Sequence, residues 1–227
     1  MFFTAPALAP VTGSGSPTGG KQAIAQESAG SAPPSEFCIE FFSVDGGLVA
    51  ETRSYLPLSF AFSRHTRQPR APVTVVDFAS ARSRDMCSEW CAKPPCVWVH
   101  VHVPASIAKD AADVMGLLGS LADNRHALSF QAPAASDLWQ TQQIESLRHR
   151  ADLRVIDVAL CCFGAPGRRD IRVAVPAASS HFGVLEQRCE HKHCPLQGAP
   201  RSDPAPRAFN SAFAAAMLAH LRQQGRD

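Results

Sequence analysis

Apolar residues in the middle of the chain follow two alternating patterns. Short apolar runs rich in β-branched and aromatic residues predict strands, most clearly at 97–103, where every odd position is valine. Between these runs, apolar residues recur at helical spacing, as at 106–122. Strands are predicted at 37–42, 58–62, 73–78, 97–103, 128–131, 154–163 and 171–175, and helices at 46–55, 83–93, 106–122 and 137–150.

This alternation of strands and helices predicts the fold class. Strands separated by helices are typical of βαβ units, so we expect an α/β fold with a doubly wound, mostly parallel sheet. In sheets of this kind, ligands bind at the carboxyl ends of the strands. The residues that follow each predicted strand are therefore the first candidates for a functional site.

The turn after the first predicted strand carries two adjacent glycines. Glycines let a ligand approach the backbone closely, and the N-terminus of the following helix offers free N–H groups. We interpret Phe42, Asp45, Gly46 and Gly47 as candidate cofactor-binding residues, and a plain tight turn is the alternative.

The two ends of the chain differ in composition from its middle. Residues 1–35 include 25 Ala, Gly, Pro, Ser or Thr and only two charged residues, so they cannot bury enough apolar surface to offset the loss of chain entropy on folding. A last helix is predicted at 209–224, with Asn210 or Ser211 as its cap. The predicted organisation is a disordered tail at 1–35, a domain at 36–198, a Pro-rich linker at 199–207 and a C-terminal helix at 208–227.

Charge and composition exclude several classes of protein. The chain has 227 residues and a formal net charge of +2, which argues against a strongly basic nucleic-acid-binding tail. It has no run of 18 apolar residues, so we expect no membrane-spanning helix. Pro6 and Pro10 interrupt the short apolar opening, which argues against a secretory signal. We therefore expect an intracellular protein whose eight cysteines are thiols or metal ligands.

In their order along the chain, the segments at the strand ends resemble the C5-cytosine DNA methyltransferases, in the divergent form found in mobile-element reading frames. The resemblance runs from about 37 to 198, and the segments 133–139 and 164–172 carry it best. It implies a Rossmann-like class I methyltransferase fold, S-adenosylmethionine as cofactor and DNA as partner. A nuclear location is also implied by the resemblance alone.

The residue that would be the nucleophile of this family is replaced. The family's Pro-Pro-Cys matches Val103-Pro104-Ala105, and alanine cannot supply the thiolate that must add to the cytosine ring. A literal Pro94-Pro95-Cys96 precedes the predicted strand at 97–103 instead of following it. We therefore expect Cys96 to lie at the opposite end of the sheet from the cofactor turn.

Other residues expected from the resemblance are also changed. Val44 stands in place of the first glycine of the cofactor turn, and Ser63 or Arg64 in place of the acidic residue that would hold the ribose. Gln131 matches the glutamate that faces the edge of the target base, and an amide cannot act as a general acid. These changes predict a degenerate active site.

A cluster of cysteines and histidines near the end of the domain predicts a metal site. Cys189, His191, His193 and Cys194 fall within six residues, and Cys161 and Cys162 lie upstream. Zinc takes four such ligands in tetrahedral geometry. The candidate ligands are Cys162, Cys189, His191 and His193, although the choice among the six residues is open, and a metal-free loop is the alternative.

The remaining polar candidates have simpler alternatives. Arg168, Arg169 and Arg172 could contact the phosphates of DNA, although charge runs of this kind are usually solvated surfaces. His100 and His102 share a strand face with Trp98 and could bind a metal, but histidines with hydrogen-bond partners or in contact with solvent are commoner. Cys87 and Cys91, one helical turn apart, are interpreted as core residues.

Three hypotheses for the function follow. The first is a degenerate DNA cytosine-methyltransferase-like domain without catalytic activity. The second is a zinc-organised module that binds nucleic acid or protein. The third is a nonfunctional relic of a mobile element.

Overall fold

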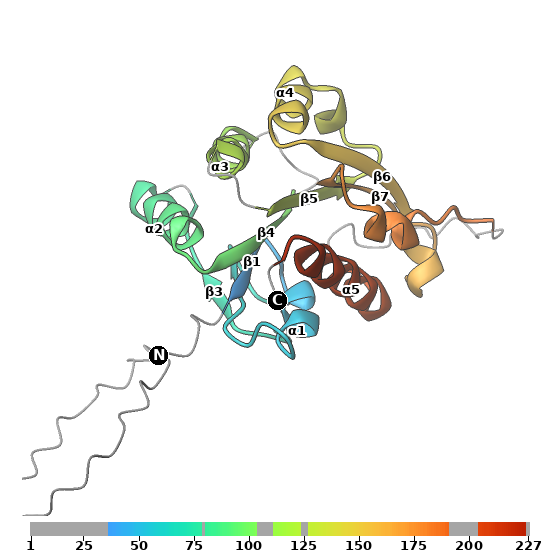
Figure 1. The fold of residues 1–227 in the computed structure, drawn as a ribbon, viewed down its shortest axis with the longest axis horizontal. Coiled ribbons are helices and arrows are strands. Elements are labelled where there is room, and N and C mark those ends of the chain that lie inside the picture. The colour runs from blue at the N-terminus through green and yellow to red at the C-terminus, as the bar shows by residue number, and fades with distance from the viewer. Residues whose placement is uncertain (1–35, 79, 104–110, 124–126, 191–203, 226–227) are drawn as a thin grey trace, which may run out of the picture. The chain divides into compact units, whose positions relative to one another are not determined.

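The described residues form one seven-stranded sheet covered by helices on both faces (Figure 1). The computed structural model describes residues 36–78, 80–103, 111–123, 127–190 and 204–225. The strands are β1 (Phe37–Phe41), β2 (Phe60–Ser63), β3 (Val73–Val75), β4 (Cys96–His102), β5 (Ala127–Pro133), β6 (Leu153–Ala159) and β7 (Asp170–Pro176). The helices are α1 (Gly47–Thr52), α2 (Ala81–Ala92), α3 (Ala111–Asp123), α4 (Gln142–Arg150) and α5 (Arg207–Gln223), with short 3-10 helices η2 (Asp137–Gln140), η3 (Leu160–Phe163) and η4 (Ser180–Leu185).

The strand order of the sheet is β3-β2-β1-β4-β5-β7-β6. Strands β1 to β5 pair in parallel, whereas β7 is antiparallel to both of its neighbours, β5 and β6. Six of the seven strands therefore point the same way, and their carboxyl ends share one edge. The predicted α/β fold with a doubly wound, mostly parallel sheet is confirmed.

Alternation along the central strands divides the core into two layers. Val99 and Val101 of β4 face the cluster that packs under α2, α3 and α4, whereas Val97 and Trp98 belong to the cluster under α1 and α5. The same two groups of helices are seen on opposite sides of the sheet in Figure 1. Helix α5 contributes Phe209, Phe213 and Met217 to the second cluster, so it belongs to the packed core of the domain.

Two predictions about helix boundaries were wrong. The segment 137–150 is not one helix. The Thr141 hydroxyl accepts a hydrogen bond from the Ile144 N–H, so a new helix, α4, begins after η2. Neither Asn210 nor Ser211 caps the last helix, because this helix begins at Arg207, three residues before Asn210. The predicted end is confirmed, since Gly225 follows the helix with a φ of 73°.

Several predicted features lie outside the described residues. They are the tail at 1–35, the linker residues 199–203, Ala105, His191, His193 and Cys194. No helix in the described part of the chain combines the length and apolar character needed to cross a lipid bilayer.

Candidate functional site

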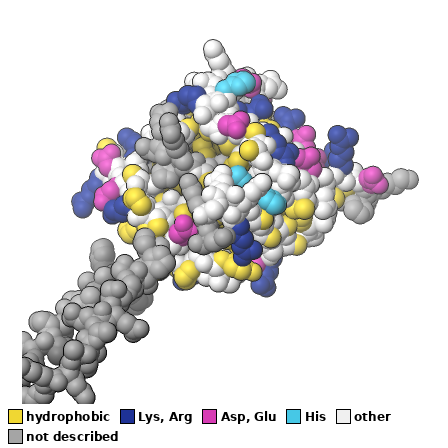
Figure 2. Space-filling model, viewed as in Figure 1, with side chains coloured by type: hydrophobic (Ala, Val, Ile, Leu, Met, Phe, Trp, Pro, Cys, Tyr) yellow, Lys and Arg dark blue, Asp and Glu magenta, His cyan; other side chains and the backbone are white. Residues whose placement is uncertain are grey.

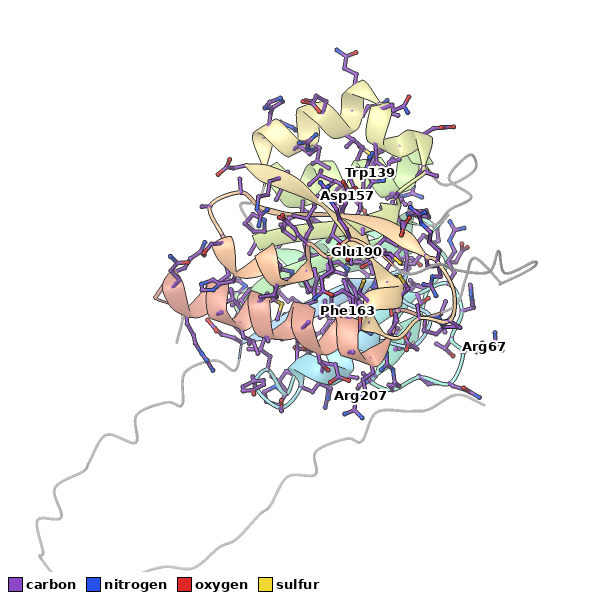
Figure 3. All side chains as sticks on the ribbon, turned by 90° about the vertical axis from the view of Figure 1, so that its right-hand side faces the viewer. Arg67, Trp139, Asp157, Phe163, Glu190 and Arg207 are labelled. Carbon is purple, nitrogen blue, oxygen red and sulfur yellow. The ribbon has the colours of Figure 1, made fainter. Side chains whose placement is uncertain are left out.

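The turn between β1 and α1 is closed by the segment that joins β2 to β3. The Asp45 carboxylate, 6% exposed, binds Arg70, with both Nε and Nη2 lying 2.8 Å from Oδ2. The N–H groups of Arg67 and Arg70 donate to the carbonyls of Val44 and Asp45, both at 2.8 Å. Arg67 itself lies at the outer rim of this segment (Figure 3). The segment therefore covers the turn that was predicted to approach a cofactor.

The prediction that the start of α1 offers free N–H groups was wrong. Four consecutive N–H groups donate to side chains of the protein itself, and two buried carboxylates provide most of the acceptors. The bonds run from Gly46 to Ser43 Oγ (3.0 Å), from Gly47 to Asp45 Oδ1 (3.1 Å), and from Leu48 and Val49 to Glu40 (3.4 and 3.1 Å). The anion that a helix N-terminus attracts is therefore built into this chain.

Both glycines of the turn have structural reasons for being there. Gly46 adopts a φ of 65°, which most side chains avoid. A Cβ on Gly47 would collide with the side chains of Arg70 and Asn210. The close approach that Gly47 permits is thus made by the protein's own side chains, and a role of Asp45, Gly46 and Gly47 in cofactor binding stays a prediction.

A cavity of about 250 Å³ lies beside this turn, on the α2 and α3 side of the sheet. Phe42, which has a φ of 59°, lines it together with Phe78, and their ring centroids are 4.3 Å apart. Arg84 also lines the cavity, with its Nη1 donating to the Phe78 carbonyl at 2.9 Å. Phe78 and Arg84 were not predicted as site residues, although Phe78 ends the predicted strand at 73–78.

A continuous chain of buried hydrogen bonds crosses β1, β4 and β5 on the α5 side of the sheet. Parallel pairing sets Glu40 beside His100, and His102 beside Gln131, in neighbouring register positions. The bonded pairs are Glu40 Oε1 and His102 Nε2 (2.6 Å), His102 Nδ1 and Gln131 Nε2 (2.9 Å), Gln131 Oε1 and His100 Nε2 (3.3 Å), His100 Nδ1 and Ser129 Oγ (2.7 Å), and Ser129 Oγ and Trp98 Nε1 (2.8 Å). We call these six residues the polar chain.

Burial and hydrogen bonding together set the ionisation of the polar chain. Burial by itself raises the pKa of the Glu40 carboxyl, but the hydrogen bond and field of His102 and the Val49 N–H outweigh it and lower this pKa to about 2. Burial lowers the pKa of His100 to about 3, with a further contribution from His102. At neutral pH, Glu40 is therefore an ionised carboxylate and His100 a neutral imidazole.

The predictions for Cys96, for the two cysteines of α2 and for the two histidines of β4 are confirmed. Cys96 lies at the amino end of β4, beside Phe37, and is 8% exposed. Burial raises the pKa of its thiol to about 12, so it is not a thiolate at neutral pH. Cys87 and Cys91 are buried in the core under α2. His100 and His102 do share the strand face with Trp98, where they have hydrogen-bond partners.

The arginines predicted to contact DNA are paired with acidic or carbonyl groups. Arg168 Nε lies 2.8 Å from Asp170, Arg172 Nε lies 2.9 Å from Asp157, and Arg169 donates to a carbonyl at 3.4 Å. Positive and negative side chains are likewise interspersed over the face seen in Figure 2. DNA binding by these arginines stays a prediction.

Two of the six residues predicted as candidate metal ligands, Cys161 and Cys189, come together near η3. Burial and the neighbouring thiols of Cys189 and Cys162 raise the pKa of Cys161 to about 11. Cys162 Sγ lies 3.8 Å from the Arg188 carbonyl. Phe163 holds η3 against α5, with its ring 5.6 Å from that of Phe209 (Figure 3). Within the described residues, no group of three or more Cys, His, Asp or Glu side chains could hold a metal ion.

No protein-family model and no curated protein matches this chain significantly. It is similar to a solved E. coli structure described as a DNA modification methyltransferase encoded within a prophage, with a TM-score of 0.43, 16% identity, and coverage of 63% of this chain and 47% of that chain. It is also similar to an antibiotic-related methyltransferase (TM-score 0.40, 9% identity, 61% and 86% coverage) and to a Legionella pneumophila protein (TM-score 0.42, 7% identity, 68% and 83% coverage).

Likenesses at this level carry no argument about function. The fold is established by the sheet itself: with the strand order β3-β2-β1-β4-β5-β7-β6 and β7 alone reversed, the described part of the chain has an α/β fold built on a mostly parallel sheet.

Proposed function

We propose that this chain is a methyltransferase-like domain that does not transfer methyl groups to cytosine. The surroundings of Gln131, the residue that matches the base-facing glutamate of the resembled family, carry this proposal. Both ends of its amide are engaged by His100 and His102, at 3.3 and 2.9 Å. An amide held in this way can neither protonate a base nor turn toward one without breaking the polar chain.

The thiols support the same proposal. Methyl transfer to a cytosine ring carbon needs a thiolate that adds to the ring. In the resembled family this thiolate follows the strand that corresponds to β4. Cys96 is at the other end of β4 and is kept neutral by burial. The matching position after this strand, by sequence, is Ala105.

S-adenosylmethionine fits only part of this site. The cavity beside Phe42 and Phe78 is aromatic and large enough for a planar ring, so these two residues would hold the adenine ring. The turn at Asp45 is less suitable for the amino-acid end of that cofactor, because Arg70 covers it and its N–H groups are already bonded. When bound, this cofactor would supply an activated methyl group.

We expect the purified full-length chain to incorporate no label when it is incubated with methyl-labelled S-adenosylmethionine and DNA. The physical reason is that Cys96 is a buried neutral thiol at the amino end of β4 and that Ala105 stands after this strand in the sequence. An active bacterial cytosine methyltransferase serves as the positive control. As a second readout, DNA containing 5-fluorocytosine should form no covalent adduct with the chain, whereas methylated DNA or an adduct would contradict the proposal.

A second candidate function is a zinc-organised binding module. The contact between the Cys161 and Cys189 thiols favours it, since it brings together two sequence segments that each carry further candidate ligands. In this reading the ligands come from Cys162, Cys189, His191 and His193, and Cys161 is an alternative to its neighbour.

We expect a protein of this kind to carry stoichiometric zinc after purification without chelators. Elemental analysis by plasma mass spectrometry measures the metal, and the variant Cys189→Ser should lose most of it. Cys87→Ser, which changes a buried core thiol, is the matched control and should keep the zinc content. Full-length protein that holds no zinc, with a melting temperature unaffected by chelator, would exclude this candidate.

A further inference from the structure

Three thiols that solvent can reach gather at one place in the described part of the chain. Four of the described cysteines are buried, and the other three, Cys161, Cys162 and Cys189, are partly exposed. Cys161 and Cys162 belong to η3, and Cys189 follows η4, 28 residues after Cys161. The three thiols therefore come from two segments that only the fold brings together.

Backbone hydrogen bonds hold these two segments side by side. The Ala159 N–H, at the end of β6, donates to the Gln187 carbonyl at 3.1 Å. Further along, the Cys162 thiol donates to the Arg188 carbonyl at 3.8 Å. Residues 187–189 thus run alongside residues 159–162, and Phe163 and Glu190, which directly follow the two segments, are seen near each other in Figure 3.

Both segments are also anchored in the core on the α5 side of the sheet. Leu160, the first residue of η3, and Leu185, the last residue of η4, are fully buried in the same apolar cluster. The Leu160 N–H donates to the Arg169 carbonyl, and the Gln187 N–H donates to the Leu185 carbonyl, both at 2.8 Å. The thiols are therefore presented by backbone that packing and hydrogen bonds hold in place.

Cys161 is the thiol that faces Cys189. Its side chain is hydrogen-bonded to the thiols of both Cys189 and Cys162. Because Cys161 and Cys162 are adjacent in sequence, their Cα atoms are only about 3.8 Å apart, which is closer than the separation of about 4.4–6.8 Å in ordinary disulfides. Cys189, on the other segment, is therefore the better partner for a covalent bond to Cys161.

We propose that Cys161 and Cys189 form a peroxide-sensitive disulfide site, in which oxidation links η3 covalently to the segment that follows η4. The contact between the two thiols, their partial exposure and the fixed backbone on both sides carry this proposal. Two reacting groups that the fold already holds together combine far faster than two thiols that must first meet.

Hydrogen peroxide or another hydroperoxide is the oxidant. The sulfur of the first thiol attacks a peroxide oxygen, so that an S–O bond forms and the O–O bond breaks. The thiol proton leaves with the departing oxygen, as water when the oxidant is hydrogen peroxide. The second sulfur then attacks the resulting sulfenic acid, the S–S bond forms, and the S–O oxygen leaves as water with the second thiol proton. Two thiols and one hydrogen peroxide thus give one disulfide and two waters, whichever sulfur reacts first.

The disulfide site rests on neither of the functions proposed above. A zinc ion bound through Cys189 would use the same sulfur atom, so zinc binding and oxidation exclude each other at this residue. The disulfide is therefore measured on protein that has been freed of metal by a chelator, and the zinc content is measured separately. Failure of either proposal then leaves the other intact.

The bond would close a loop of chain that contains β7 and η4. A disulfide stabilises a protein largely by restricting its unfolded chain, so we expect oxidation to raise the melting temperature by about 5–10 °C. Because both sulfurs are partly exposed, a dithiol such as dithiothreitol should reduce the bond and reverse this rise.

The experiment treats the reduced, full-length chain with hydrogen peroxide, blocks the remaining thiols by alkylation and digests the protein with trypsin. Trypsin releases residues 155–168, which carry Cys161 and Cys162, and residues 189–192, whose one cysteine is Cys189. Mass spectrometry without reduction should find these two peptides linked to each other. The linked species should be lost after treatment with dithiothreitol.

Two variants identify the partner of Cys189. Cys161→Ser should remove both the linked peptides and the rise in melting temperature. Cys162→Ser, at the adjacent position, is the matched control and should keep both, because the Cys162 thiol contacts the Arg188 carbonyl. The proposal is overturned if peroxide oxidises the wild-type thiols without linking the two peptides, or if Cys161→Ser still forms the link.

Discussion

Replacement of Glu40 by alanine is expected to lower the free energy of unfolding by about 3–5 kcal/mol. The carboxylate is fully buried and accepts hydrogen bonds from the N–H groups of Leu48 and Val49 and from His102. Removal of the side chain leaves all three donors without their acceptor, and the N–H groups of Leu48 and Val49 are buried where water does not replace it. Urea denaturation of the full-length chain, followed by circular dichroism at pH 7.5, measures the effect.

Two further variants separate the charge of Glu40 from its shape. Glu40→Gln keeps the size and one acceptor oxygen, so it should cost less than alanine, about 1–3 kcal/mol. Glu89→Ala removes an exposed carboxylate on α2 that pairs with Lys93, and should change stability by less than about 0.5 kcal/mol. If Glu40→Ala were as mild as Glu89→Ala, the buried carboxylate would not hold β1, α1 and β4 together.

A fall in pH from 7.5 to 4.5 is expected to lower the free energy of unfolding by about 2–3 kcal/mol through His100 alone. Burial lowers the pKa of His100 to about 3 in the folded chain, whereas an unfolded histidine has a pKa of about 6.5. Between these two values the unfolded chain binds a proton that the folded chain does not. The contribution of His100 is therefore present above pH 6.5 and is lost as the pH falls toward 3.

The Glu40 carboxylate affects the free energy of unfolding in a separate, more acidic pH range. Because the folded pKa of Glu40 is lowered to about 2 from an ordinary value of 4.5, its contribution is present above pH 4.5 and is lost as the pH falls toward 2. His100→Gln should remove the contribution of His100 to the pH dependence of the free energy of unfolding below pH 6.5. The contribution of Glu40 below pH 4.5 should remain. Urea denaturation at a series of pH values measures both, and an unchanged slope between pH 6.5 and 4.5 in this variant would refute the assignment to His100.

The sheet could be predicted largely from local patterns. Val97, Val99, Val101 and Val103 alternate with polar or aromatic residues, which is enough to indicate a strand with two different faces. The boundaries were less predictable where a short-range hydrogen bond decided them. Thr141 interrupts the helical pattern at 137–150 because its hydroxyl caps the helix that begins after it, and apolar spacing carries no trace of this bond.

The candidate site was predictable only in part. Phe42 was predicted to lie at the site, and it lines a cavity with Phe78. The N–H groups after Gly46 were predicted to be free, and the carboxylates of Glu40 and Asp45 occupy them instead. Arg70, which covers this turn, lies 25 residues from Asp45 in sequence, and no spacing rule connects the two.

The sequence by itself determined the alternation of strands and helices, the mostly parallel sheet, and the absence of a thiol at the position that matches the family's nucleophile. Only the tertiary structure decided what the polar residues of the strands do. Glu40 and Gln131 lie 62 and 29 residues from His102, and each becomes its neighbour through the parallel register of β1, β4 and β5. Strand register is set by the packing of whole strands, so a hydrogen-bonded chain across three of them cannot be read from any one segment.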